Sequence, residues 1–198
     1  MRQICQGLRE AHGIGLIHRD IKPGNVFAAQ RGGLYDVAKL LDFGLVKPVT
    51  ETPEARLTQE GGISGTPLFM SPEQARGLAE VDARSDIYSL GAVVYALLTG
   101  RPPFDSANPM EVMIAHVRDE VARPSQHQAD VPADLELIIL RCLAKNPEDR
   151  YQDAESLEQA LAECAAADQW TQWHAARWWQ VNDHTARTPP GLSVTAND

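Results

Sequence analysis

The chain has 198 residues, of which 43% are hydrophobic and 23% are charged, and its net charge at pH 7 is −9. The length fits one globular domain, and this hydrophobic content excludes disorder of the whole chain. The acidic balance argues against nucleic acid as the main partner, because phosphate binding needs clustered Lys and Arg. The three cysteines, Cys5, Cys142 and Cys164, show neither metal-binding spacing nor a disulfide framework, so we expect buried thiols.

The N-terminus shows no signal peptide, since Met1-Arg2 is followed by a polar stretch rather than an apolar run. The most apolar segment, residues 87–98, is shorter than the roughly 20 residues that a membrane-spanning helix needs. We therefore expect no membrane segment in this chain.

The first part of the chain predicts a helix followed by a small hairpin. Residues 1–12 carry apolar side chains at helical spacing. Two short apolar strands are expected at 26–28 and 37–41, and Gly32-Gly33 between them suits the positive φ of a hairpin turn. Residues 46–64 have the composition of a long polar loop.

Four helices are predicted after that loop. Asp86 can cap a helix that is apolar on all sides and that ends before Gly100, which is typical of a buried central helix. Asn108, with Pro109 and Glu111 behind it, opens a second helix. A third is expected over 135–145, and a fourth runs from its cap, Asp153, to about Ala166. The sequence thus predicts a mostly helical domain.

Residues 18–25 read H-R-D-I-K-P-G-N and match the pattern H-R-D-x-x-x-x-N, which is typical of loops that transfer a phosphoryl group. That reaction needs a carboxylate to orient and deprotonate a hydroxyl, and oxygen ligands for Mg²⁺. Asp20 fits the first role and Asn25 the second, while Lys22 can neutralise the transferring phosphoryl group. An H-R-D tripeptide by itself is more often an ordinary surface turn.

Three further motifs follow in order and remove that alternative. Leu41-Asp42-Phe43-Gly44 comes after a predicted strand, where Asp42 can bind a metal that bridges phosphates and Phe43 can pack. Gly65-Thr66-Pro67 and Ser71-Pro72-Glu73 then occur at a suitable distance, the latter in the place of an A-P-E motif.

With these motifs, residues 1–166 resemble the large, C-terminal lobe of the protein kinase superfamily, and most of all the bacterial eukaryotic-like serine/threonine kinases. The resemblance implies an α+β, mostly α, fold with small β-hairpins that carry the active-site loops. Lys22 resembles the Ser/Thr specificity signature. Thr66 agrees, since the family's threonine contacts the catalytic loop and helps to select a hydroxyl substrate. Ser71 departs from the pattern, because the family usually has Ala there.

The family also implies roles for residues outside the chemistry. Glu73 should form an ion pair with Arg150, and Asp86 should steady the backbone of the catalytic loop as well as cap the central helix. ATP and Mg²⁺ are the implied cofactors, bound through Lys22, Asn25 and Asp42, with the metal on the last two. The resemblance further assigns structural roles to His18, Phe43 and Gly44.

The resemblance also implies a mode of regulation. In the family, the arginine in the position of Arg19 often receives a phosphate from the following loop, because phosphate pairs strongly with arginine. Thr58 is the first candidate for that phosphosite and Ser64 the second. Glu60 occupies a place where bacterial relatives often carry a second phosphorylated threonine. It either substitutes for that charge or is a solvated loop acid.

The predicted function is transfer of the ATP γ-phosphate to Ser or Thr hydroxyls of proteins in the complete parent enzyme, in the cytoplasm. A second kinase of the same type, acting in trans, is a further expected partner. The family's Gly-rich loop, strand lysine and helix glutamate lie upstream of the H-R-D motif and are absent from the printed sequence. We therefore expect weak transfer, or none, by the isolated chain. The alternatives are a non-catalytic kinase remnant that acts as an interaction module, and a fragment of a longer product.

The C-terminal residues fall into two parts. Residues 167–187 contain Trp170, Trp173, Trp178 and Trp179 and are expected to form a terminal helix that packs back on the lobe, the alternative being an exposed docking site. Residues 188–198 are expected to be a loose tail.

Overall fold

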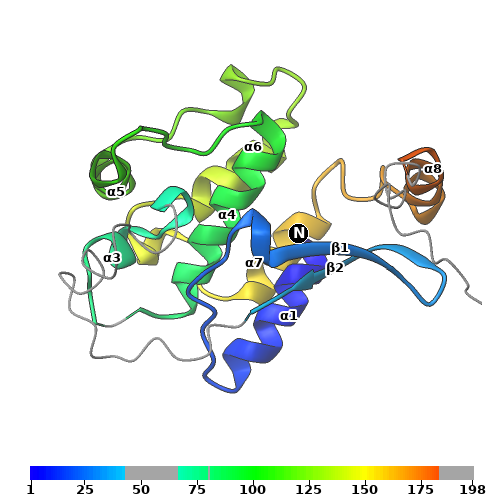
Figure 1. The fold of residues 1–198 in the computed structure, drawn as a ribbon, viewed down its shortest axis with the longest axis horizontal. Coiled ribbons are helices and arrows are strands. Elements are labelled where there is room, and N and C mark those ends of the chain that lie inside the picture. The colour runs from blue at the N-terminus through cyan, green and yellow to red at the C-terminus, as the bar shows by residue number, and fades with distance from the viewer. Residues whose placement is uncertain (43–66, 80, 183–198) are drawn as a thin grey trace, which may run out of the picture.

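The structure, a computed structural model, describes residues 1–42, 67–79 and 81–182. Helices surround a central helix, and a two-stranded hairpin extends away from them (Figure 1). The elements are α1 (Arg2–Gly13), β1 (Val26–Arg31), β2 (Leu34–Leu40), α3 (Pro72–Ala75), α4 (Ala83–Thr99), α5 (Pro109–Arg118), α6 (Ala133–Cys142), α7 (Ala154–Ala162) and α8 (Gln172–Asn182). This agrees with the prediction of a mostly helical α+β chain.

Helix α4 is the centre of the core. Its residues from Ser85 to Tyr95 are all buried, as the absence of a polar face predicted. The prediction that Asp86 caps this helix is wrong. The helix begins one turn earlier, at Ala83, and the side chain of Asp82 accepts the backbone N–H of Arg84 (2.9 Å). Gly100 ends the helix in the left-handed conformation (φ 73°), as expected.

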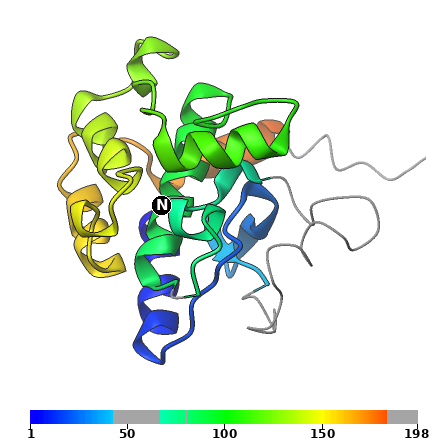
Figure 2. The same ribbon diagram turned by 90° about the vertical axis from the view of Figure 1, so that its left-hand side faces the viewer.

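Helix α6 packs against α4, α5 is bonded to α4 through Tyr88 and His116, and α7 packs against α1 and α6 (Figure 2). The predicted starts of these helices agree with the structure better than the predicted ends of α6 and α7. Asn108 and Asp153 cap α5 and α7 through their side chains, as predicted. Helix α6 ends at Cys142 instead of reaching residue 145, because the following backbone turns its carbonyls toward the Arg150 side chain. Helix α7 ends at Ala162, since the next segment leaves the helix and the Ala165 N–H binds Asp134 (2.7 Å).

The hairpin is longer than its apolar pattern indicated. Strands β1 and β2 are antiparallel, with Val26 opposite Leu40 and Arg31 opposite Leu34. The turn is formed by Gly32 and Gly33, both at positive φ as predicted. The added residues beside the turn are mostly polar or exposed, so hydrophobic alternation could not reveal them.

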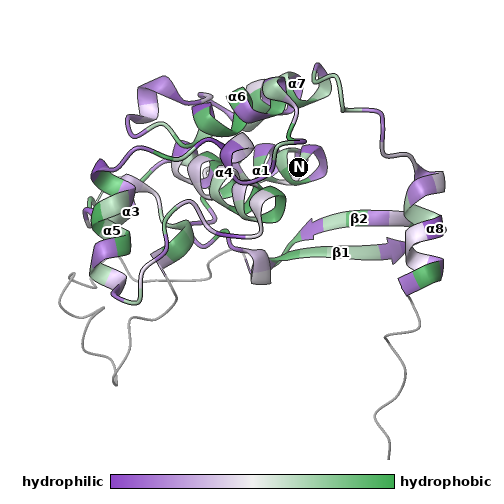
Figure 3. Cartoon of the chain, turned by 90° about the horizontal axis from the view of Figure 1, so that it is seen from above, coloured by the Kyte–Doolittle hydropathy of each residue, from purple (hydrophilic) through white to green (hydrophobic). Residues whose placement is uncertain are grey.

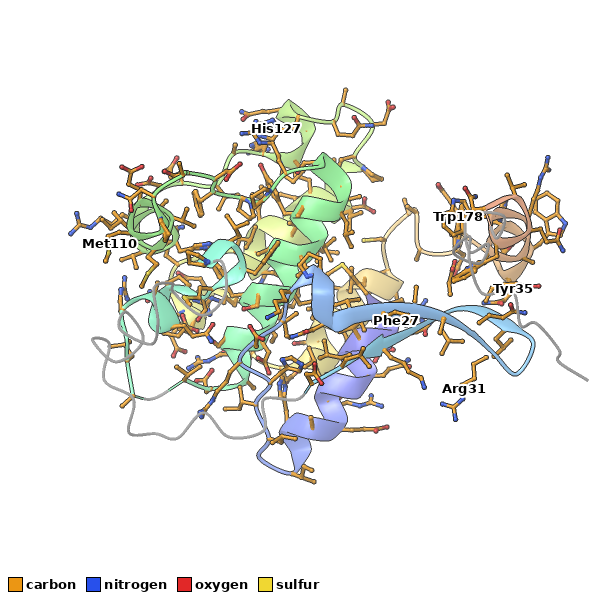
Figure 4. All side chains as sticks on the ribbon, in the orientation of Figure 1. Phe27, Arg31, Tyr35, Met110, His127 and Trp178 are labelled. Atoms are coloured by element: carbon orange, nitrogen blue, oxygen red, sulfur yellow. The ribbon has the colours of Figure 1, made fainter. Side chains whose placement is uncertain are left out.

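Helix α8 packs against the hairpin and stands apart from the central helices (Figure 3). Both carboxylate oxygens of Asp36 accept an indole N–H, one from Trp170 and one from Trp179, each at 2.7 Å. The Gln172 side chain accepts the Tyr35 N–H (2.9 Å) and donates to the Tyr35 carbonyl (3.0 Å). Figure 4 shows Tyr35 and Trp178 at this end of the molecule, far from Met110 on α5. The predicted terminal helix is present, and its partner is the hairpin.

The remaining expectations concern cysteines and membranes. All three cysteines are buried free thiols. Burial raises the pKa of the Cys5 thiol to about 11, so this group stays protonated at neutral pH. Among the described residues, no helix is both long and apolar enough to cross a bilayer.

Candidate active site

The H-R-D-x-x-x-x-N residues lie between the end of α1 and the start of β1, beside the buried N-terminal turns of α4. Asp86 of α4, which is 1% exposed, accepts the backbone N–H groups of His18 and Arg19, both at 2.8 Å. The His12 ring adds a third bond to the same carboxylate (2.9 Å). Asp86 therefore holds the backbone just before Asp20 against the core.

Arg19 has a left-handed backbone conformation, with φ of 65°. For a residue other than Gly, this region costs roughly 1–2 kcal/mol, so surrounding contacts must maintain it. The two bonds from Asp86 supply part of that constraint. The strained residue immediately precedes Asp20, whose carboxylate direction depends on this backbone.

Three polar side chains of the motif converge. Lys22 Nζ lies 2.8 Å from Asp20 Oδ2, and both side chains are partly exposed. The buried Asn25 donates its amide N–H₂ to the Asp20 carbonyl (2.8 Å) and to Asp20 Oδ2 (3.2 Å). A cation and an amide thus fix one carboxylate oxygen of Asp20.

His18 links this loop to the start of the D-F-G motif. Its Nδ1 accepts the Asp20 N–H (3.2 Å), which leaves Nε2 to donate to the Leu41 carbonyl (2.9 Å). The ring is fully buried. His18 therefore connects the backbone at Asp20 with the residue before Asp42.

Asn25 and Asp42 lie at the same open end of the hairpin. The Leu41 N–H binds the Asn25 carbonyl (2.8 Å), so the two chain segments are adjacent there. Because the Asn25 amide nitrogen is bonded to Asp20, its Oδ1 is the atom left for a ligand. An amide oxygen and a carboxylate are the hard oxygen donors that Mg²⁺ prefers. The donor set therefore fits a magnesium ion, although no cluster of three or more His, Cys, Asp or Glu occurs in the described part of the chain.

A buried ion pair lies behind the site. Arg150 is fully buried and donates to both oxygens of Glu73, at 2.8 and 2.9 Å. Its guanidinium also donates to the carbonyls of Arg84, Ala144 and Lys145, which uses the whole donor fork. Burial opposes ionisation of Glu73, but the bonds and charge of Arg150 outweigh it and hold the Glu73 pKa below its ordinary value. The pair joins α3 to the segment before α7.

Sequence reasoning missed other contacts in this region. The His12–Asp86 bond gave no sequence signal, because it joins residues that lie far apart in the chain. Ser71 and Gln74 form a capping box on α3, and the S-x-x-Q spacing could have predicted it. The buried hydroxyl of Ser71, the residue that departs from the family pattern, hydrogen-bonds Ser85 on α4.

Several predicted residues lie outside the described residues. They are Phe43, Gly44, Thr58, Glu60, Ser64 and Thr66.

Comparison with known proteins places this geometry in a family. Residues 1–163 match the family model described as the protein kinase domain. The chain belongs to the protein kinase domain family. The matched kinase region ends within three residues of the predicted boundary at Ala166 and leaves α8 outside.

The kinase domain is similar to bacterial serine/threonine kinases, as the motifs predicted. Serine/threonine-protein kinase PknB of Mycolicibacterium smegmatis is 43% identical over 157 residues, which cover 79% of this chain and 24% of the relative. PknB of Mycobacterium tuberculosis shows the same values. A probable PknB of Corynebacterium glutamicum is 40% identical over 162 residues, 80% of this chain and 24% of the relative. The chain thus spans about a quarter of the length of these relatives.

Proposed function

We propose that this chain is the large lobe of a serine/threonine protein kinase and that, in the complete parent enzyme, it transfers the γ-phosphate of ATP to protein hydroxyls. The observation that carries this proposal is the convergence of Lys22 and Asn25 on Asp20, beside the hairpin end that bears Asp42. Protein kinases obtain most of their catalysis from positioning and electrostatics, and such an arrangement serves both. The names of the relatives support Ser and Thr as acceptors.

In the proposed reaction, each residue has a distinct task. Asp20 orients the acceptor hydroxyl and accepts its proton as the new phosphoester bond forms. Lys22 neutralises charge on the transferring phosphoryl group. Asn25 and Asp42 would hold Mg²⁺, which would offset the negative charge of the ATP phosphates. A reaction that consumes ATP is expected in the cytoplasm.

The partners and the regulation proposed for this site follow from the same chemistry. Arg19 is exposed and so is accessible to a phosphate group on the loop that contains Thr58 and Ser64. A second kinase of the same type is the proposed donor of that phosphate. If Glu60 supplies part of this negative charge, Glu60→Ala should lower the kinase activity of the complete enzyme. Unchanged kinase activity would contradict this role of Glu60.

The decisive experiment measures phosphate transfer with the missing elements supplied. In the family, the residues that cover the ATP phosphates lie upstream of the H-R-D motif. We would therefore fuse the small lobe of the M. tuberculosis relative to this chain and measure transfer of γ-³²P-phosphate to a protein substrate. The unfused chain and an Asp20→Asn fusion serve as controls, and nucleotide binding by both fusions verifies folding.

We expect phosphoserine or phosphothreonine from the fusion and a loss of at least about 10²-fold in the Asp20→Asn fusion, since general-base catalysis contributes about 10²–10⁴-fold. The unfused chain should transfer little. A fusion that binds Mg-ATP and transfers nothing contradicts the proposed activity and supports a non-catalytic interaction module.

A further inference from the structure

We propose that Gln74, on α3, is a positioning residue for the catalytic aspartate, because it holds the strained backbone next to Asp20 in place. Gln74 Nε2 donates to the Arg19 carbonyl at 2.7 Å, across the gap between α3 and the catalytic loop. This inference concerns the site of the proposed kinase reaction and rests on that function. The contact itself can be tested without measuring activity.

The oxygen and the nitrogen of the Gln74 amide each have a backbone partner, and these two partners fit only one orientation of the amide. Its Oε1 accepts the Ser71 N–H (3.1 Å), and its Nε2 donates to a carbonyl oxygen. If the amide were reversed, an N–H₂ group would face an N–H and an oxygen would face a carbonyl. A backbone donor on one side and a backbone acceptor on the other therefore fix the direction of the amide.

The Arg19 peptide is held on two sides. Asp86 accepts the N–H of Arg19 from the core side (2.8 Å), and Gln74 donates to its carbonyl from the α3 side. A residue at a left-handed φ of 65° needs such constraints on both of its peptide groups. The carbonyl bound by Gln74 belongs to the peptide that leads into Asp20, so this bond sets the plane from which the Asp20 side chain departs.

The bond also joins two functional segments. Helix α3 begins three residues after Pro67–Phe69, which follows the Gly65-Thr66 motif, and Thr66 is predicted to help to select a hydroxyl substrate. The same helix is anchored to the core by Glu73, through Arg150, and by Ser71, through Ser85. Gln74 therefore transmits the position of this anchored helix to the catalytic loop.

Gln74→Glu separates the two roles of the side chain. A glutamate keeps the oxygen that accepts the Ser71 N–H, and capping boxes commonly use Glu at this position. Its second oxygen faces the Arg19 carbonyl in place of a donor. The hydrogen bond to Arg19 is therefore lost, while the capping box with Ser71 remains. Protonation of the introduced carboxylate restores a donor, so the effect should diminish as the pH is lowered.

The first readout is NMR on the 198-residue chain, which needs no activity. In Gln74→Glu at pH 7, we expect a shifted ¹³C resonance of the Arg19 carbonyl and about fivefold faster exchange of the Arg19 and Asp20 amides, the effect of losing one hydrogen bond. Both changes should diminish toward pH 5. Gln128→Glu adds the same charge at an exposed site and should leave these signals unchanged.

The second readout uses the active fusion with the relative's small lobe. Gln74→Glu should lower kcat about tenfold and leave the KM for ATP unchanged, since a misplaced base slows the chemical step without weakening nucleotide binding. Unchanged Arg19 and Asp20 signals in the variant would show that the hydrogen bond from Gln74 to the Arg19 carbonyl does not exist. Changed signals with an unchanged kcat would overturn the positioning role. A wild-type fusion without any transfer refutes the proposed function instead, and the positioning role falls with it, whatever the NMR result.

Discussion

Arg150 and Asp36 both collect hydrogen bonds from distant parts of the chain, but they do so in different surroundings. Arg150 is fully buried and binds Glu73 together with three backbone carbonyls. Asp36 lies at the hairpin, partly exposed, and binds the indole N–H groups of Trp170 and Trp179. Water can replace the partners of Asp36 when they separate, whereas it cannot reach Arg150. We therefore expect the helical body to be held cooperatively and α8 to be docked weakly.

The candidate site belongs to the first of these regions. The backbone of His18 and Arg19 is bonded to Asp86, which lies in the same buried helix as the core residues. The hairpin that carries Asn25 and Asp42 begins at this body and ends under α8. Perturbing the body should therefore damage the site, while releasing α8 should leave it nearly intact.

The largest expected effect comes from breaking the buried ion pair. Arg150→Met leaves Glu73 charged and several carbonyls without donors, so we expect a loss of about 3–5 kcal/mol in the free energy of unfolding, measured by urea denaturation. The double variant Glu73→Met with Arg150→Met should lose less than Arg150→Met alone, because no lone charge remains. If the double variant lost as much stability as the Glu73→Met and Arg150→Met single variants added together, the two side chains would not interact, which would contradict a buried pair.

A second large effect should appear on acidification. Burial, and next the charge of Lys145, lower the pKa of His116 from 6.5 to about 4. Between those values the unfolded chain binds a proton that the folded chain excludes, so stability falls as the pH drops through this window. The total loss is about 3 kcal/mol, since each pKa unit corresponds to about 1.4 kcal/mol.

This prediction is checked by urea denaturation of the wild type and His116→Gln at pH 7.5, 6 and 5. The variant should show a smaller loss over this range. Glu73 interferes little there, because its pKa is lowered from an ordinary value of 4.5 and its stabilisation is lost only below that pH. An equal loss in both proteins would show that another group causes it.

A smaller effect is expected where α4 touches α6. A Cβ added to Gly91 would lie 2.6 Å from the Cβ of Cys142, so Gly91→Ala forces the two helices apart. We expect a loss of about 1–3 kcal/mol. Gly7→Ala is the matched control, because an added Cβ in α1 meets nothing within 4 Å and should stabilise the helix by about 0.5–1 kcal/mol. Destabilisation by both changes would contradict the close approach at Gly91.

The smallest effect concerns α8. Asp36→Asn keeps one acceptor oxygen and a side chain that tolerates the left-handed backbone of this residue (φ 53°), but it loses the bond to one tryptophan. We expect α8 to dock about 1 kcal/mol more weakly, with changed tryptophan fluorescence and no change in the unfolding of the body. Asp168→Asn removes a nearby exposed charge and should have no effect on the fluorescence.

The sequence predicted what depends on local patterns. Asn108, Asp153 and Gly100 end or begin helices where their chemistry indicated. The central helix was predicted to start one turn too late, because Asp82 and Asp86 are both suitable caps. Asp86 is instead used by a tertiary contact to the catalytic loop, which no local rule could reveal.

In the candidate site too, local sequence patterns predicted some features, whereas the tertiary contacts had no local signal. The H-R-D-x-x-x-x-N spacing was sufficient to predict that Asp20, Lys22 and Asn25 share one loop, and the structure brings them into contact. The Glu73–Arg150 pair came only from the family resemblance. Neither the motif spacing nor the family resemblance indicates the hydrogen bond from Gln74 to the Arg19 carbonyl, since this bond depends on how α3 lies against the loop.

If the backbone of His18 and Arg19 is part of the buried body, native-state hydrogen exchange of the unmodified chain should show it. The amides of His18 and Arg19, bonded to Asp86, should exchange as slowly as those in the middle of α4, while the α8 amides exchange through an opening of lower free energy. If the His18 and Arg19 amides exchange as fast as those of α8, the loop is not held by the body, which contradicts the role given to Asp86.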